Sequence, residues 1–584
     1  MPLAIDTVNK LKTAIADAIN KAASNCELKL DTAQTGTQHL DFNIETPADR
    51  THGDFSSNAA MANAKTFKLP PRKIAEIIVN NLDQTGLDIE KIEIAGPGFI
   101  NFCLSSGFYG KAMSEIVQQG DNYGQSDFGE NQKVMVEFVS ANPTGPMHMG
   151  NARGGAIGDC LAAVMKAAGY DSYKEFYVND AGNQIEKFAQ SLNARYLQIF
   201  KGDEVEFPED GYQGADITER AEEFAAENGD SFVNAEESLR KAALVEFALP
   251  KNISKMQSDL QKYRIEYDRW FFESELHNSG KVEQVISLLK DAGLTYEKDG
   301  ALWYKNAEVV ANKLRQEGKS EKDIEKLELK DDVLVRQNGN PTYFAADIAY
   351  HKDKFDRGFK TLINVWGADH HGHVMRMKCA MDAIGCNGDD LTVILMQLVK
   401  LVQNGQQVRM SKRTGKAVQL ADLLEEVPVD STRFLFNTAQ ANVPMDFDLD
   451  LAVKQDSQNP VYYVQYAHAR ICSIIRSMAE ESITQSSATQ EDFALLQTAQ
   501  ERDLIFHLAQ FPGEIIYSSK EKDPTKITRY VTETAALFHK FYNSCRVKGE
   551  EQHLAAARLT LCVCTKTVIA NVLRMFNITC PEKM

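Results

Sequence analysis

The chain has 584 residues, of which 43% are hydrophobic and 25% charged, proportions that are ordinary for a soluble protein of several domains. Its net charge of -18 argues against a general nucleic-acid coat, although an acidic body can still carry a local basic face. The chain does not open with a basic segment and an unbroken apolar run, and it has no run of about 18 apolar residues. We therefore expect neither a signal peptide nor a membrane span.

Residues 1–115 are predicted to form a small α+β domain. The chain begins with an amphipathic helical pattern, and a second helix is expected near residues 71–83. Residues 89–104 alternate like two strands around the turn Gly96-Pro97-Gly98. A polar stretch at 118–132 ends the domain.

The next segment is predicted to open a nucleotide-binding α/β unit. "KVMVEFVSA" (133–141) alternates like a strand, and apolar residues between 156 and 168 recur at helical spacing. The glycine-rich loop between them would let the backbone and a helix N-terminus approach a phosphate. Since the loop matches neither G-x-G-x-x-G nor the P-loop pattern, dinucleotide and P-loop chemistry are not indicated. Taken alone, a tight turn with a packing histidine explains it too.

Residues at about 195–330 are charged and mostly helical, and we interpret them as an insertion. Strand patterns precede it at 172–182 and return at 362–373 and 391–412, the last with a hairpin signal at Asn404-Gly405. The pattern is helical from about residue 425 to the end. The sequence thus predicts an α/β fold: a Rossmann-type parallel sheet with an insertion at 120–425, an N-terminal α+β domain and an α-helical domain at 426–584.

Two motifs, in this order, resemble the signatures of class I aminoacyl-tRNA synthetases. His148-Met149-Gly150-Asn151 resembles "HIGH", with Asn151 in place of the second histidine, and Arg409-Met410-Ser411-Lys412-Arg413 resembles "KMSKS". The resemblance implies that a carboxylate attacks the α-phosphate of ATP, with catalytic roles for His148, Asn151 and Lys412. A carboxylate needs no deprotonation at pH 7, whereas charge building on the phosphates needs donors and cations.

The resemblance also implies one ATP site made by both motifs and by "GADHHGH" (367–373). Its nucleotide-binding residues would be His148, Gly150, Asn151, Gly367, Asp369, His370, Met410, Ser411 and Lys412. Mg²⁺ is expected through ATP, with no dedicated protein ligand. The histidines beside Asp369 also permit a zinc site, an interpretation that we disfavour. The ten cysteines contain no C-x-x-C pair, which favours a reducing cytoplasm over a disulfide framework or a zinc site.

Further segments resemble arginyl-tRNA synthetases in the family's order over nearly the whole chain. They include "YVNDAGNQI" (177–185), "PTYFAADIAYH" (341–351) and "DFDLDLA" (446–452). The resemblance implies L-arginine as substrate and assigns to its pocket Glu137, Ser140, Asn142, Asp180, Gln184, Tyr343 and Asp347. A guanidinium presents five donors in a planar fork and needs carboxylates around it. Outside this context Glu137 would be an exposed strand carboxylate and Tyr343 a core aromatic residue.

The same resemblance implies tRNA contacts at both ends of the chain. The N-terminal domain resembles the family's extra domain, which contacts the tRNA elbow, and Asn101 is expected to contact a base or to stabilise a turn. The C-terminal helices resemble a DALR-type anticodon-binding domain, with a degenerate match at 555–558 and expected tRNA contacts at Tyr466 and Arg470. We therefore expect a cytoplasmic monomer that binds tRNA, arginine and ATP but neither DNA nor a membrane, and that activates arginine only with tRNA bound.

Three other functions fit parts of the sequence. A synthetase for another amino acid would have no use for Glu137 together with Asp347. A catalytically inactive relative is compatible with Asn151, but less so with the retained His148 and Lys412. A metal-dependent hydrolase built on residues 367–373 would leave the second motif and the terminal domains unexplained.

Overall fold

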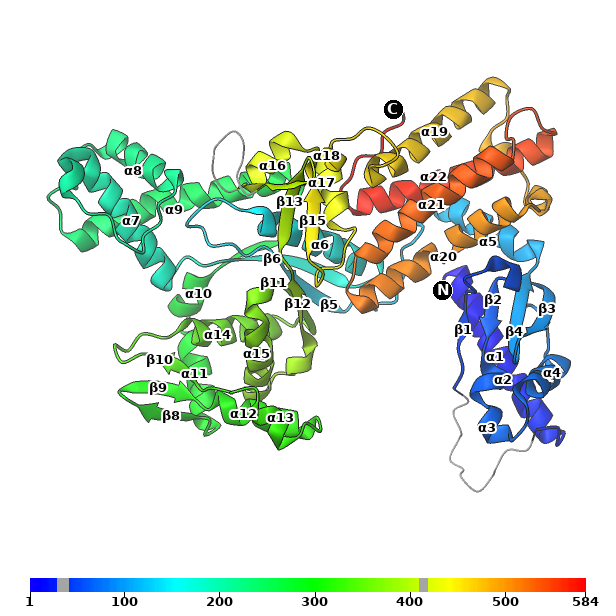
Figure 1. Ribbon diagram of the computed structural model, residues 1–584, viewed down its shortest axis with the longest axis horizontal. Coiled ribbons are helices and arrows are strands. Elements are labelled where there is room, and N and C mark those ends of the chain that lie inside the picture. Colours follow the sequence, from blue (N-terminus) through cyan, green and yellow to red (C-terminus); the bar gives the residue numbers. More distant parts are fainter. Residues whose placement is uncertain (29–40, 409–417) are drawn as a thin grey trace. The chain divides into compact units, whose positions relative to one another are not determined.

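The computed structural model describes residues 1–28, 41–408 and 418–584 (Figure 1). Met410, Ser411 and Lys412, which were assigned to the ATP site, lie outside the described residues. The chain divides into two compact units. The catalytic unit comprises residues 127–455 with 523–525, and the terminal unit comprises residues 1–126, 456–522 and 526–584.

A five-stranded parallel sheet forms the centre of the catalytic unit, which confirms the predicted parallel α/β fold. Its strand order is β12-β11-β5-β6-β7, and every neighbouring pair is parallel. The bounds are β5 Lys133–Glu137, β6 Asp171–Val178, β7 Arg269–Phe272, β11 Thr361–Gly367 and β12 Leu391–Met396. The chain winds outward from β5 in one direction and from β11 in the other. The topological switch, where ligands of such sheets bind, therefore lies between β5 and β11 at their carboxyl ends.

Both faces of this sheet are covered by helices, as the alternation along β5 requires. Val134 and Val136 pack into one core with α6 (Met149–Ala167), and Met135 packs into the other with α14 (Tyr343–Asp356) and α15 (His371–Ala383). The glycines of α6 permit close packing: a Cβ at Gly158 would lie 2.2 Å from the Phe138 ring. The first core also holds α16 (Leu420–Glu426) and α17 (Val429–Phe436).

The predicted insertion is mostly helical, but it also contains a strand of the central sheet. Its helices are α7 Gly182–Lys201, α8 Ala215–Asn228, α9 Glu237–Lys262, α10 Glu273–Asn278, α11 Lys281–Asp291, α12 Asn306–Gln316 and α13 Glu321–Glu325. A small antiparallel sheet is formed by β8 Thr295–Lys298, β9 Ala301–Tyr304 and β10 Asp332–Val335. Within the predicted insertion, Arg269–Phe272 forms β7, the edge strand next to β6.

The predicted hairpin is confirmed. β13 (Val399–Gln403) pairs with β14 (Gln406–Val408) through Asn404-Gly405, whose φ angles of 52° and 72° both lie in the left-handed region that such a turn requires. The region expected to be helical after residue 425 also holds β15 (Met445–Asp448), which pairs in parallel with β13, and the short helix α18 (Leu449–Ala452).

In the terminal unit, an N-terminal α+β part packs with the C-terminal helices. Its antiparallel sheet has the order β1-β2-β4-β3, with β1 Ile44–Glu45, β2 Phe55–Ser57, β3 Ile89–Ala95 and β4 Phe99–Leu104. The helices of this part are α1 Leu3–Ser24, α2 Ala59–Ala62, α3 Ala64–Phe67, α4 Pro71–Asn81 and α5 Ser106–Gln119. These bounds confirm the helix predicted near 71–83 and the strands around Gly96-Pro97-Gly98.

Four long helices complete the terminal unit: α19 Pro460–Glu480, α20 Ala499–Glu521, α21 Thr525–Ser544 and α22 Gln552–Met575. α22 is long and apolar enough to cross a membrane, but 83% of its most apolar window is buried inside the unit. It is therefore a core helix of this bundle.

Candidate active site

The first motif lies where β5 leads into α6, at the switch point of the sheet. His148 is the N-cap of α6: its Nδ1 accepts a hydrogen bond from the Gly150 amide at 3.1 Å. The Asn151 carbonyl oxygen in turn accepts from the His148 amide at 2.9 Å, so the two side chains form a capping box. A glycine suits position 150 because a Cβ there would lie 3.1 Å from the imidazole.

This capping box determines which atoms of the motif are left for a ligand. Because Nδ1 of His148 accepts a hydrogen bond, the proton of the neutral ring is on Nε2, which is then a donor. Burial lowers the pKa of His148 and so favours the neutral ring. The Asn151 amide nitrogen is likewise left as a donor. Two side-chain donors thus stand at the positive end of α6, where an anion is favoured.

The arginine of the same motif has a structural role. Arg153 is fully buried, and its guanidinium donates to the carbonyl oxygens of Gln397 at 3.0 Å and Gln440 at 2.8 Å. Burial lowers its pKa to about 10. These bonds attach α6 to the chain that follows β12 and to the segment before β15.

One cleft of about 1010 Å³ brings together the sequence-predicted ATP residues that the structure describes. They come from two segments and are His148, Gly150, Asn151, Gly367, Asp369 and His370. Val408 and Val418, the described residues on either side of 409–417, line the same cleft. Behind it, the Leu420 amide donates to the Met147 carbonyl at 2.8 Å, so the chain after the second motif is bonded to the loop of the first.

Of the residues predicted to bind arginine, two share a face of α14 and several are tied to its surroundings. The Tyr343 hydroxyl accepts from the Gln184 amide at 3.1 Å, and the Gln184 side chain accepts from the Tyr212 hydroxyl. One turn after Tyr343, the Asp347 carboxylate is 3.2 Å from Nε2 of His373. His373, the last residue of the segment 367–373 that was expected to face ATP, is thus bonded to the predicted arginine pocket.

Asp180 and Asn142 differ in how strongly they are held. Asp180 accepts hydrogen bonds from the Ser274 amide at 2.9 Å and the Ser274 hydroxyl at 2.6 Å, which fix the start of α10. Asn142 is exposed in the loop between β5 and α6.

Glu137 does not offer the free carboxylate that the sequence suggested. It pairs with Lys354, whose side chain is fully buried, and its other oxygen accepts from the Ser140 hydroxyl at 2.9 Å. Ser140 also accepts from the Tyr177 amide at 3.2 Å. Val139 and Ser140 have positive φ angles of 68° and 39°, which are costly for residues with a Cβ. The Glu137–Ser140 bond therefore also stabilises a strained turn at the end of β5.

A carboxylate that the sequence analysis did not select stands beside these residues. Glu273, the first residue of α10, is 3% exposed and accepts from the Tyr177 hydroxyl at 2.8 Å. Burial and the nearby Asp347 carboxylate raise the pKa of Glu273. Burial and the carboxylates of Glu273, Asp347 and Glu137 raise the pKa of Tyr177, so three carboxylates surround this hydroxyl. Glu273 directly follows β7, and residues at the carboxyl end of a parallel strand commonly line a ligand site. Sequence analysis could have selected Glu273 if it had recognised β7 as a strand.

The zinc interpretation has no geometric support in the part of the chain that the structure describes. No group of three or more His, Cys, Asp or Glu side chains there is arranged to hold a metal ion. His370 lies 3.8 Å from Asp369, whereas His373 is bonded to Asp347.

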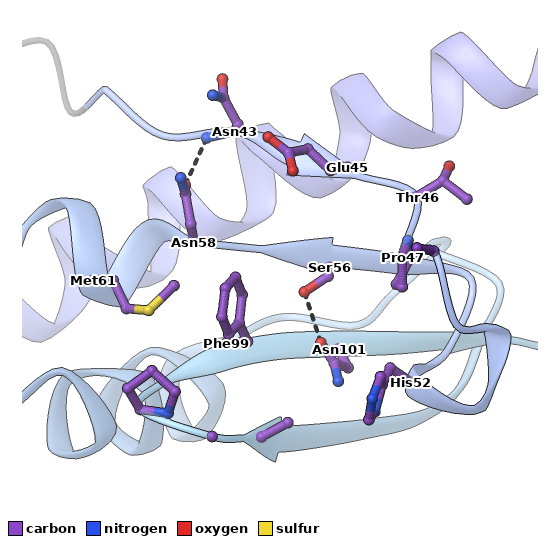
Figure 2. A pocket seen from close by; sticks show the side chains of 14 residues that line it. Asn43, Glu45, Thr46, Pro47, His52, Ser56, Asn58, Met61, Phe99 and Asn101 are labelled. Atoms are coloured by element: carbon purple, nitrogen blue, oxygen red, sulfur yellow. Dashed lines mark hydrogen bonds between the residues drawn. The ribbon is translucent and has the colours of Figure 1, made fainter.

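The residues predicted to contact tRNA lie at two places in the terminal unit. Asn101 lines a pocket of about 720 Å³ on the four-stranded sheet, where its side-chain oxygen accepts from the Ser56 hydroxyl at 2.7 Å (Figure 2). Phe99, 39% exposed, lines the same pocket. On α19, Tyr466 is 38% exposed, and Arg470 donates to its hydroxyl at 3.3 Å and lies over the Tyr542 ring at 4.5 Å. Both places offer aromatic faces beside polar donors.

Comparison with known proteins gives consistent matches along the whole chain. Three family models match: "Arginyl tRNA synthetase N terminal domain" at 9–104, "tRNA synthetases class I (R), catalytic domain" at 112–475 and "DALR anticodon binding domain" at 464–584. The chain is 51% identical to an arginine–tRNA ligase of Ruminiclostridium cellulolyticum, over 98% of each chain. It is also 51% identical to one of Caldanaerobacter subterraneus, again over 98% of each. Its fold resembles Thermus thermophilus arginyl-tRNA synthetase, with a TM-score of 0.73 and 20% identity over 99% of this chain and 100% of that one.

Proposed function

The chain belongs to the arginyl-tRNA synthetase family, and on this premise we propose how its residues serve that activity. It is an arginine–tRNA ligase of class I, which activates L-arginine with ATP and transfers it to tRNA. The predictions of family, enzyme class and function are thereby confirmed. The roles of individual residues, set out below, are our proposals.

The capping box at the start of α6 carries the proposal for the activation step. The arginine carboxylate attacks the α-phosphate, and pyrophosphate leaves. Nε2–H of His148 and the amide of Asn151 donate to phosphate oxygens, where the α6 N-terminus adds its positive potential. Asn151 can replace the second histidine of the family motif because one amide both caps the helix and donates. Lys412 is proposed to neutralise the departing pyrophosphate.

Mg²⁺ is proposed to enter with ATP and to neutralise part of the phosphate charge. Mg²⁺ sites at nucleotides commonly take their ligands from phosphates and water. The adenine and ribose are proposed to lie against Gly367, Asp369 and His370, with Gly150, Met410 and Ser411 completing the nucleotide site.

The balance of charge around Tyr177 supports the proposed arginine pocket. Of its three carboxylates, Glu137 is paired with Lys354. Among the described residues, Asp347 and Glu273 have no Lys or Arg partner: Asp347 contacts His373, and Glu273 lies 3.5 Å from Nε2 of His277. Two carboxylates suit a planar cation with five donors. We propose that Asp347 and Glu273 bind the guanidinium and that Tyr343, Gln184 and Asp180 shape the pocket. Glu137, Ser140 and Asn142 remain proposed ligands of the substrate.

The tRNA contacts are proposed at both places in the terminal unit. A base would stack on Phe99 and bond to Asn101, and the anticodon region would meet Tyr466 and Arg470. We propose an elbow-contacting domain at 1–115, a catalytic domain at 120–425 with its insertion, and an anticodon-binding domain at 426–584. We further propose that the protein acts as a cytoplasmic monomer and binds neither DNA nor a membrane.

Aminoacylation with competing amino acids tests the proposal. The purified chain should charge its tRNA with L-arginine and should use lysine and citrulline far less well. An ammonium cannot fill a planar multi-acceptor site, and citrulline lacks the charge that two carboxylates require. Citrulline activated as readily as arginine would contradict the proposed pocket.

A further inference from the structure

A second cleft lies beside the pocket of Figure 2 in the terminal unit, and we name it the α20–α21 cleft. Its volume is about 730 Å³. The N-terminal wall is formed by Thr46, Pro47, Ala48 and Arg50. The helical walls are formed by Asp503, Phe506, His507, Gln510, Glu514 and Tyr517 of α20, and by Lys526, Arg529, Tyr530, Glu533, Leu537 and Lys540 of α21.

Arg50 holds the two sides of this cleft together. It donates to Asp54 within its own domain and to Asp503 of α20 at 3.3 Å. Its guanidinium also lies 3.8 Å from the centre of the Phe506 ring. An ion pair and a cation–π contact to the same helix fix the N-terminal wall against α20. The cleft is therefore a preformed feature of the terminal unit.

The α20–α21 cleft is continuous with the pocket that contains Asn101. Residues Thr46, Pro47 and Ala48 line both cavities, so the two share one wall. A polymer with one unit in the pocket would place its neighbouring unit along this wall. Both cavities exceed 700 Å³, which is ample for nucleotide-sized units.

Three cations in the cleft form no ion pair or hydrogen bond with any described residue. They are Lys526, whose amine lies 5.1 Å from the centre of the Tyr517 ring, and the exposed Arg529 and Lys540. They lie on one side of α21, because residues 526, 529 and 540 recur near helical spacing. On a chain of net charge -18, this row of unused cations marks a local site for anionic groups.

The carboxylates and the aromatic residue narrow the class of ligand. Glu514 and Glu533 face the same cleft and would weaken the binding of a simple polyanion. They suit a ligand that alternates anions with hydroxyl donors, as RNA does with its phosphates and 2′-hydroxyls. Tyr517, 46% exposed, adds a face for stacking, and the buried side-chain nitrogen of Gln510 has no acceptor in the structure.

We propose that the α20–α21 cleft binds the sugar–phosphate backbone of the tRNA segment next to the nucleotide in the Asn101 pocket. Arg529 and Lys540 contact its phosphates, and Glu533 accepts from a 2′-hydroxyl. The inference rests on the proposed function, because it extends the tRNA contact of the same unit. It adds a second site, on the C-terminal helices, for the same stretch of RNA.

The first test replaces both exposed cations in the full-length chain. Arg529→Ala combined with Lys540→Ala should raise the KM for tRNA roughly tenfold at low salt. The slope of log K for tRNA binding against log salt concentration should become shallower by about one to two. Neither side chain forms an ion pair or hydrogen bond with a described residue, so kcat at saturating tRNA should be unchanged. Lys65→Ala is the matched control, since Lys65 is exposed in the same unit but outside both cavities.

Hydroxyl-radical footprinting of the bound tRNA locates the contact. The double variant should lose protection of riboses near the elbow and keep it at the anticodon and the acceptor end. Glu533→Ala, which removes the acceptor for the 2′-hydroxyl, should bind all-ribose tRNA more weakly than wild type does. When those riboses are replaced by 2′-deoxyriboses, the affinity of this variant for tRNA should fall less than that of the wild type.

The outcomes separate this inference from the proposed function. If the wild-type chain fails to charge tRNA with arginine, the proposed function is wrong. If it charges normally and the double variant matches Lys65→Ala in KM and salt dependence, the cleft does not bind the backbone. A loss of protection confined to the anticodon would also overturn the proposal.

Discussion

His148 is oriented by its own helix, because the Gly150 amide donates to Nδ1 and leaves Nε2 as the donor. A side chain fixed in this way loses little entropy when phosphate binds, as preorganised catalysis requires. The same bond means that His148→Ala removes both the helix cap and the ligand contact. The two roles can nevertheless be separated, because asparagine is a good N-cap with a shorter reach.

His148→Ala should lower the rate of arginine-dependent pyrophosphate exchange, measured with tRNA present, by roughly two to three decades. The KM for arginine should change little, because the lost contact acts on the phosphates. His148→Asn retains a cap for α6 but not the Nε2 donor, so it should be as slow as His148→Ala. Recovery of the wild-type rate in His148→Asn would show that capping alone accounts for the residue.

Glu273→Gln should raise the KM for arginine by roughly one to two decades while leaving the KM for ATP unchanged. The amide keeps the shape of the side chain and can still accept from Tyr177, but it removes one of two negative charges facing the guanidinium. Steady-state aminoacylation against arginine concentration measures the effect. Glu283→Gln, an exposed change on α11, serves as control. An unchanged KM for arginine would leave Asp347 as the main counter-charge.

Some pocket residues could be paired from the sequence and others could not. Tyr343 and Asp347 are four residues apart in a helical pattern, so their common face was predictable. The partner of Glu137 is Lys354, 217 residues further along, and no local pattern connects them. Glu273 was missed for a related reason, since its place depends on a strand that was itself not recognised.

Helices and strands were predicted correctly from the sequence where a turn motif or a hydrophobic periodicity within the element itself determines them. The strand–loop–helix at the first motif and the Asn404-Gly405 hairpin are determined by residues within one or two turns of each other. β7 and β15 are four residues each, and both are extended because they pair with distant strands. Short strands surrounded by helices therefore escape detection from local pattern.

The helices of the terminal unit should become less stable in mild acid because His507 is buried as the neutral form. Burial lowers the pKa of His507 to about 4, and its ring stacks on Tyr530 at 4.2 Å. Between pH 6.5 and 4 the unfolded chain takes up a proton that the folded chain refuses, so stability falls as pH falls. The loss from pH 7 to pH 5 should be about 2 kcal/mol.

Urea unfolding followed by far-ultraviolet circular dichroism at pH 7 and pH 5 measures this loss. His507→Gln has no such titration, so its stability should differ less between the two pH values than that of the wild type. Equal losses in both proteins would assign the acid sensitivity to other groups.

Over the whole molecule, the two ends of the chain fold into one compact unit. Residues 1–126 and most of 456–584 belong together. Arg50 donates to Asp503 of α20 at 3.3 Å, and the Tyr123 hydroxyl donates to the Leu508 carbonyl at 3.0 Å. Domain boundaries drawn along the sequence cannot show such an association, because it joins segments hundreds of residues apart. Two proposed tRNA-contacting surfaces are thereby placed on one body.

This division offers a route for the coupling that we predict between tRNA binding and amino-acid activation. The second motif, at 409–413, belongs to the catalytic unit, and the chain enters the helices of the terminal unit at residue 456. The intervening segment contains α16 and α17, which pack in the core that holds α6 and the first motif. A tRNA bound to the terminal unit can therefore influence both motifs through the chain connection at residues 455–456.

We predict negligible arginine-dependent pyrophosphate exchange without tRNA and robust exchange with it. Such a switch requires tRNA to bind the active arrangement more tightly than the inactive one, by a few kcal/mol for near-complete conversion. Exchange is measured against tRNA concentration on one preparation, with tRNA lacking its 3′-terminal adenosine to show that activation does not need the acceptor group. In the Arg529→Ala/Lys540→Ala variant, half-maximal exchange should require more tRNA but reach the same plateau. Full exchange at zero tRNA would disprove the coupling and leave the ligase activity itself unaffected.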